Sequence, residues 1–206
     1  ILHYFNISVL HITTSMINKD FWRKINSNQA DYDKFRRIII GQSAQAQHLA
    51  KQAIFALHRD NMVEAEEKLA ESQQLIQKME IDFKQNQKLR NEPTWSSAVE
   101  EFAEAKLFLA YQKGEEVGEI VGVDIHADEY VGGLSDFTGE LHRQAVLLSS
   151  KDEFEKVKKI AEEISDIIHL LLEYNLGGYL RTKFDQAKKN LNKIEYILYD
   201  INMKKK

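Results

Sequence analysis

The chain has 206 residues, of which 43% are hydrophobic and 29% are charged, and its formal net charge is −4. This length and apolar content allow a sizeable core and require no more than one compact domain. Overall charge gives no attraction to phosphate, so a nucleic-acid surface would have to be a local basic patch. The absence of cysteine excludes disulfides, thiolate zinc sites and cysteine nucleophiles, and leaves oxygen and imidazole as metal ligands.

The chain lacks the features of membrane and secreted proteins. No apolar run approaches the roughly 18 residues of a membrane-spanning helix, so we expect no membrane partner. The lack of cysteine favours a cytoplasmic setting. The first fifteen residues, ILHYFNISVLHITTS, are uncharged and have neither the basic start nor the cleavage site of a secretory signal. We expect residues 1–15 to be a non-structural extension.

The rest of the chain predicts an all-α fold of about seven helices. One proline and nine glycines leave few places where helices can be interrupted. The first helix should run from about Phe21 to Arg59. A second should begin at Asn61, an N-cap with Glu64 three residues later, and should run towards Arg90. A third should follow Pro93 and end at the glycine at 114.

The second half of the chain begins with a connector that contains three glycines, in which we expect one helical turn. Further helices should cover 127–149 and 152–174. The glycine pair at 177–178 should turn the chain into a last helix that ends near Met203. Residues 16–206 would then form a single helical domain.

The stretch VEEFAEAKLF, residues 99–108, places two carboxylates on an apolar helix face. Glu101 and Glu104 lie roughly 60° apart around the helix, with Phe108 between them and Ala105 close by. A carboxylate near apolar surface needs a partner or a metal, because an uncompensated buried charge costs several kcal/mol. This face is therefore a candidate site.

A second acidic face lies in SDFTGELHR. Asp136 and Glu140 are four residues apart, and Arg143 falls on the same line. Gly132, Gly133 and Gly139 flank this line. Glycine weakens a helix, so three of them suggest that another backbone or a ligand approaches closely there.

If the two faces meet, four carboxylates would converge and would repel one another unless protons or a hard cation intervened. Oxygen ligands suit Mg²⁺ or Mn²⁺, which can activate water against a phosphodiester. The alternative is that both pairs are ordinary solvated helix charges. The Glu-x-x-His pairs of di-iron bundles, phosphate-binding glycine loops and serine hydrolase signatures are absent.

Three segments resemble the translin superfamily, which comprises translin and translin-associated factor X. They are, in family order, AKQAIFALHRDN, DEYVGGLSDFTGELHRQAV and LRTKFDQAKKNLNKIEYILYDI. EEFAEA is similar to the Glu-aromatic-x-Glu-Ala of translin-associated factor X, and the chain looks like an archaeal-type member of that branch. Asp136 falls on the aspartate that completes the metal site of that branch, and Glu140 on the glutamate one turn later.

The resemblance implies a translin-like α-helical bundle and a magnesium-dependent endoribonuclease that acts on single-stranded or nicked RNA inside a hollow, roughly octameric shell. The implied ligands are Glu101, Glu104, Asp136 and Glu140. The shell could be a homo-oligomer or include a translin-like subunit. The alternative is an oligomer that binds single-stranded DNA or RNA without cutting it.

Phosphate contacts need basic side chains. Our candidates are Arg37, Lys51, His58, Arg59, Arg90 and Arg143. Each could equally be a solvated helix charge or a packing residue, and Arg143 could simply pair with Glu140. Apolar side chains that we expect on the surface would suit an assembly; they are Phe154, Val157, Leu170 and Leu172.

Overall fold

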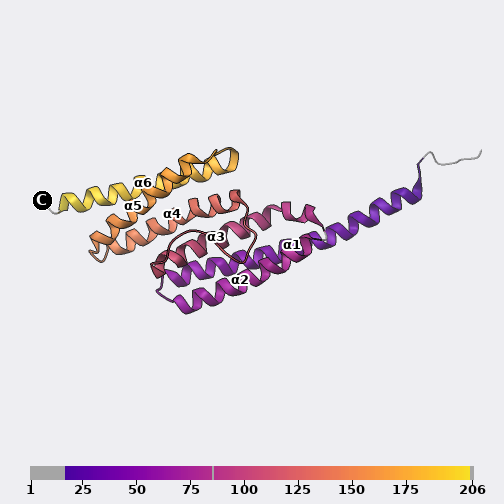
Figure 1. Ribbon diagram of the computed structural model, residues 1–206, viewed down its shortest axis with the longest axis horizontal. Helices are drawn as coiled ribbons and strands as arrows, with labels where there is room; N and C mark the ends of the chain where they lie inside the picture. Colours follow the sequence, from indigo (N-terminus) through magenta and orange to yellow (C-terminus); the bar gives the residue numbers. More distant parts are fainter. Residues whose placement is uncertain (1–16, 85, 205–206) are drawn as a thin grey trace, which may run out of the picture.

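The structure, a computed structural model, describes residues 17–84 and 86–204. The predicted extension, residues 1–15, lies outside this range. Within it the chain forms six α-helices, one 3-10 helix and no strand (Figure 1), which confirms the all-α prediction. The helices are α1 (Lys19–Leu57), α2 (Met62–Phe83), η1 (Gln87–Asn91), α3 (Pro93–Lys113), α4 (Ala127–Ser149), α5 (Phe154–Glu173) and α6 (Gly178–Lys204).

Several helix ends follow the predicted capping signals. The Asn61 side chain accepts a hydrogen bond from the Glu64 backbone N–H at 3.3 Å, which caps α2 as expected. Pro93 is the first residue of α3, and Gly114 ends that helix in the left-handed conformation at φ 70°. None of the described helices is long and apolar enough to cross a membrane.

Two local predictions were wrong. The second helix ends at Phe83 and not near Arg90. Its buried stripe runs through Ile76, Met79 and Phe83, and Leu89 lies off that stripe, so a continuous helix would turn Leu89 away from the core. The 3-10 helix η1 turns Leu89 inward, where it is buried. The connector over 114–126 contains no helical turn.

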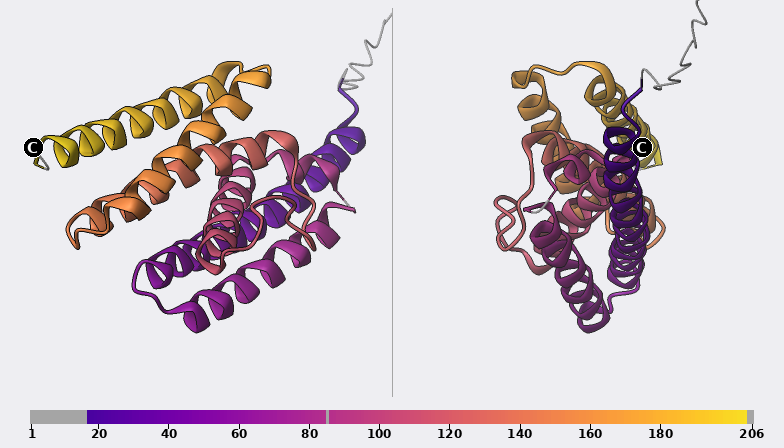
Figure 2. Two further views of the ribbon diagram at one scale, coloured as in Figure 1. Left: turned by 60° about the vertical axis from the view of Figure 1, so that its left-hand side comes forward. Right: turned by 90° about the vertical axis from the view of Figure 1, so that its right-hand side faces the viewer.

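The helices pack as two groups of three. The first consists of α1, α2 and α3, the second of α4, α5 and α6, and α3 packs against α4 to join them. Figures 1 and 2 show the second group beside the first, with the N-terminal part of α1 extending beyond the body. The junction of α3 with α4 therefore lies at the centre of the molecule.

Helix α3 is buried on most of its circumference. Its inward residues include Trp95, Phe102 and Phe108, and the Trp95 and Phe83 rings meet in a T-shaped contact with 4.6 Å between their centroids. This extent of burial explains why α3 is apolar around most of its surface rather than along one stripe. Polar side chains in the middle of α3 are thereby enclosed by neighbouring helices.

Two glycines of α4 allow α3 to come close. A Cβ added at Gly133 would lie 2.8 Å from the Ala103 Cβ and 2.8 Å from the Glu100 carbonyl oxygen. A Cβ at Gly132 would lie 2.7 Å from the Glu100 carboxyl carbon. The predicted close approach is confirmed here. Gly139 differs, since among the described residues a Cβ added there would meet only the Asn190 side chain, at 3.5 Å.

Candidate metal centre

The two acidic faces predicted from the sequence face one another across the junction of α3 and α4. Glu101 and Glu104 come from α3, and Asp136 and Glu140 from α4. After burial itself, the charges of Glu101, Asp136 and Glu140 raise the pKa of Glu104, so all four carboxylates lie within electrostatic reach. The predicted juxtaposition of the two faces is present.

Glu104 is the most unusual member of this group. It is 7% exposed, and no hydrogen bond or ion pair reaches its carboxylate from the part of the chain that the structure describes. Burial is the first cause that raises its pKa, to about 9, and the three neighbouring carboxylates add to it. In the absence of a cation Glu104 is therefore protonated at neutral pH.

Glu101 lies nearer the surface and has partners from α1. Its side chain is 16% exposed, with Lys51 Nζ at 3.6 Å and a long hydrogen bond from Gln47 Nε2 at 3.5 Å. Burial raises the pKa of Glu101, and the charge of Lys51 partly offsets this rise. Unlike Glu104, this carboxylate therefore has a basic partner.

Asp136 is paired with Lys183 of α6. The Lys183 ammonium group donates to Asp136 Oδ2 and also lies 3.1 Å from Glu100 Oε2. The Tyr179 hydroxyl donates to the same Glu100 oxygen at 2.7 Å. Burial lowers the pKa of Lys183, but its bonds to Asp136 and Tyr179 and the nearby negative charges outweigh burial and raise it. Lys183 therefore bridges a carboxylate of α3 and one of α4.

Glu140 is paired with His58, the C-cap residue of α1. His58 Nε2 contacts Glu140 Oε2, and the imidazole ring lies against Phe108 with centroids 4.9 Å apart. His58 Nδ1 is buried without a hydrogen-bond partner among the described residues. Arg143 is more distant, at 3.8 Å from the same Glu140 oxygen. His58 is thus a neighbour of the acidic group.

The types of side chain in this group suit a divalent cation, but their present positions do not form a complete set of ligands. Four carboxylates and no thiol suit a hard ion, and the unpartnered Glu104 carboxylate would gain the most from one. In the ranges 17–84 and 86–204, however, no three acidic or histidine side chains are arranged to hold a metal ion. Asp136 and Glu140 are turned instead to basic partners.

Most of the predicted phosphate-binding residues lie on the surface. Arg37 is exposed, Arg59 pairs with Glu64 at 3.3 Å, and Lys51 is half exposed beside Glu101. The Arg143 guanidinium is 46% exposed and lies over the Phe55 ring, 5.2 Å from its centroid. Lys51 and Arg143 thus place positive charge next to the acidic group.

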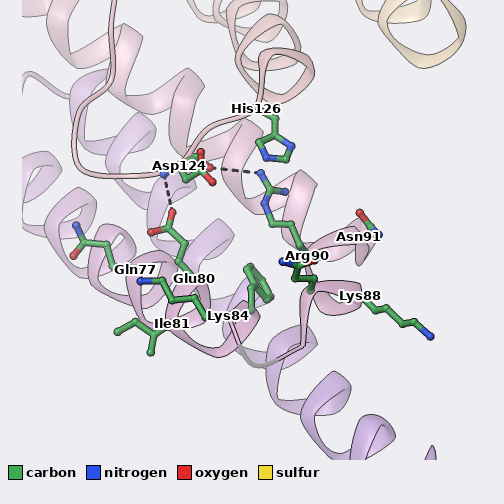
Figure 3. A pocket seen from close by; sticks show the side chains of 11 residues that line it. Gln77, Glu80, Ile81, Lys84, Lys88, Arg90, Asn91, Asp124 and His126 are labelled. Atoms are coloured by element: carbon green, nitrogen blue, oxygen red, sulfur yellow. Dashed lines mark hydrogen bonds between the residues drawn. The ribbon is translucent and has the colours of Figure 1, made fainter.

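Arg90 is placed differently, in a pocket between the end of α2, η1 and the connector (Figure 3). It donates to both Glu129 oxygens, at 2.6 and 2.7 Å, and lies over the Trp95 ring at 5.0 Å. Glu129 also accepts a hydrogen bond from the His126 backbone at the start of α4. Arg90 therefore has a structural role, whether or not it also contacts nucleic acid.

Sequence reasoning missed three residues of this centre, namely Glu100, Tyr179 and Lys183. Glu100 could have been found, because it lies four residues before Glu104 on the same helix face. Lys183 and Tyr179 belong to α6, and the sequence gives no register of α6 against α4. Their proximity to the acidic faces becomes visible only in the folded chain.

The fold and site define an all-helical protein with a partly buried acidic centre between its two helical groups. The chain belongs to the Translin family, whose sequence profile matches residues 24–205. No curated protein matches it.

Three solved structures share the fold. The crystal structure of AfC3PO has a TM-score of 0.80 at 19% identity and covers 88% of this chain and 97% of its own. The structure of the AfC3PO–duplex RNA complex has a TM-score of 0.78 at 18% identity, and the match covers 88% of this chain and 96% of that chain. The crystal structure of apo-NeC3PO has a TM-score of 0.78 at 19% identity, and the match covers 86% of this chain and 95% of that chain.

Proposed function

We propose that the chain is a subunit of a metal-dependent endoribonuclease, closest to translin-associated factor X and of the archaeal type. Its substrate would be single-stranded or nicked RNA, held inside a hollow oligomer. Family membership supports a role in nucleic-acid binding or cleavage. The similar AfC3PO is described in complex with duplex RNA, which supports RNA as the class of substrate.

The observation that carries the proposal is Glu104. A carboxylate that is buried, unpaired within the described ranges and surrounded by three other carboxylates costs stability. A helical bundle would be more stable with an apolar residue at this position. The cost is understandable if the group holds a cation that is needed for a reaction.

The cation would be Mg²⁺ or Mn²⁺, with Glu101, Glu104, Asp136 and Glu140 as the residues that hold it. When bound, the ion supplies Lewis-acid stabilisation of charge on the phosphate. Lys51 and Arg143, half exposed beside Glu101 and Glu140, would position the RNA backbone. A carboxylate of the group would accept a proton from the attacking water.

The test is cleavage of single-stranded RNA by wild-type protein and by Glu104→Gln, with and without Mn²⁺ or Mg²⁺. We expect wild type to cleave only with the metal and the variant to lose about 100-fold or more in rate. Glu162→Gln, at an exposed position of α5, is the matched control and should cleave like wild type. Equal cleavage by Glu104→Gln would remove the proposed mechanism.

A second candidate is a subunit that binds single-stranded DNA or RNA without cutting it. It is favoured by the contacts of Lys183 and His58 that occupy Asp136 and Glu140 and by the lack of a ready group of three ligands among the described residues. Full binding without turnover in any divalent metal would establish this role instead.

The oligomer itself is supported by apolar side chains on the surface. Leu170 and Leu172 of α5 are 60% and 61% exposed, and Phe21 and Trp22 of α1 are also exposed. Val157 was wrongly expected there, because it is fully buried. Light scattering of the purified chain, alone and with a translin-like subunit, would distinguish a homo-oligomer from a mixed one.

A further inference from the structure

The charge balance of the acidic centre depends on Lys183. Its ammonium group contacts Asp136 of α4 and lies 3.1 Å from Glu100 of α3. The Lys183 side chain is only 17% exposed, so this charge is held among the helices. A positive charge beside the carboxylates of α3 and α4 is thus supplied from within the chain.

A cation that binds Asp136 would compete with the Lys183 ammonium group, which contacts Asp136 Oδ2. A ligand oxygen lies about 2.0 to 2.1 Å from Mg²⁺, so an ion on Asp136 would come within a few ångströms of the ammonium group. Two positive charges so close repel strongly in a half-buried site. Binding of an ion is therefore weakened unless the lysine moves away from Asp136.

The surroundings provide a place for the displaced ammonium group. Glu100 is fixed by the Tyr179 hydroxyl at 2.7 Å and by the Gly132 backbone, against which it packs. A pocket lined by Asp136, Tyr179 and Lys183 opens to solvent on the same side. The flexible lysine stem can release Asp136 and keep its contact with Glu100.

We propose that Lys183 is an internal counter-ion that releases Asp136 to a divalent cation and is then retained by Glu100 and Tyr179. Lys183 and Glu100 are positioning residues, since they act through Asp136 and not on the substrate. The inference rests on the proposed function, because it takes the acidic centre to be a cation site. It predicts that the two residues have opposite effects on cation affinity.

The test is calorimetric titration of Mn²⁺ into RNA-free protein. Lys183→Met should bind Mn²⁺ about tenfold more tightly than wild type, because no ammonium group has to be displaced. Glu100→Gln should bind about tenfold more weakly, because, of the carboxylates Asp136 and Glu100, only Asp136 then remains as a partner of Lys183. Controls with the same charge changes are Lys189→Met and Asp185→Asn, exposed residues of α6 at the same pocket, and these should change the affinity less than about twofold.

A double-mutant cycle separates positioning from simple charge. In the Lys183→Met background, Glu100→Gln should change the Mn²⁺ affinity less than about threefold, because the lysine it retains is gone. Lys183→Gln replaces Lys183→Met if circular dichroism shows that the latter does not fold.

The outcomes distinguish the two proposals. If wild type binds Mn²⁺ and Lys183→Met binds it equally well, the inference is wrong and the cation site stands. An undiminished effect of Glu100→Gln in the double variant also overturns the inference. If neither wild type nor Lys183→Met binds Mn²⁺, the proposed metal-dependent function fails.

Discussion

Replacement of Gly133 by alanine tests the close approach of α3 and α4. Alanine in place of a mid-helix glycine normally stabilises a protein by about 0.5–1 kcal/mol. At Gly133 the new methyl group would lie 2.8 Å from the Ala103 Cβ, 2.8 Å from the Glu100 carbonyl oxygen and 3.0 Å from the Glu104 backbone nitrogen. Two of these neighbours are backbone atoms, which cannot rotate away.

Overpacking of this kind costs about 1–3 kcal/mol, and the rigidity of the neighbours favours the upper end. The net effect is a destabilisation of about 1–2 kcal/mol. For a chain of this length 1 kcal/mol corresponds to roughly 2–4 °C in Tm, so Gly133→Ala should lower Tm by about 2–8 °C.

The assay is urea and thermal unfolding followed by circular dichroism, with Gly41→Ala as the control. Gly41 lies in α1 with no atom within 4 Å of an added Cβ, so this variant should be stabilised by about 0.5–1 kcal/mol. The reasoning would be refuted if both variants gained stability by the same amount.

Three further predictions concern charged residues. Glu104 has a folded pKa of about 9, above its ordinary 4.5. The folded state therefore holds an extra proton between these values, and metal-free wild type should lose stability from pH 4.5 to 9. Glu104→Gln should flatten this slope and be the more stable protein at pH 8; a variant that keeps the slope would contradict the assignment.

Arg90→Ala should cost about 3–5 kcal/mol in urea unfolding, because it leaves Glu129, 5% exposed, without its partner; a loss under 1 kcal/mol would mark the pair as a weak surface bridge. Arg37→Ala should leave the free energy of unfolding within about 0.5 kcal/mol of wild type. In fluorescence titrations of RNA at several salt concentrations, the slope of log affinity against log salt should fall by about 1. Unchanged binding would remove Arg37 from the interface.

Local chemistry made much of the fold predictable. Asn61 and Gly114 fix helix ends through hydrogen bonds and backbone conformation within a few residues. The apolar neighbours of Glu104 within its own helix likewise placed this carboxylate on an apolar face, where the structure buries it. Where a feature depends on neighbours within about one helical turn, the sequence carries the information.

Features that depend on distant packing were not predictable. The break after Phe83 exists because Leu89 enters the core, which the periodicity of α2 does not reveal. Arg90 looked like a free basic residue, but Glu129, 39 positions away, pairs with it. The contact of Lys183 with Asp136 likewise joins residues 47 positions apart. Such pairs are set by how helices cross.

The basic partners of the acidic residues come from opposite ends of the chain, from α1 and from α6. During synthesis, α3 and α4 leave the ribosome well before residues 178–204, so Glu100 and Asp136 then lack the ammonium group that later neutralises them. A chain truncated before α6 would therefore lack this ammonium group at the crossing of α3 and α4 and would keep two like charges there.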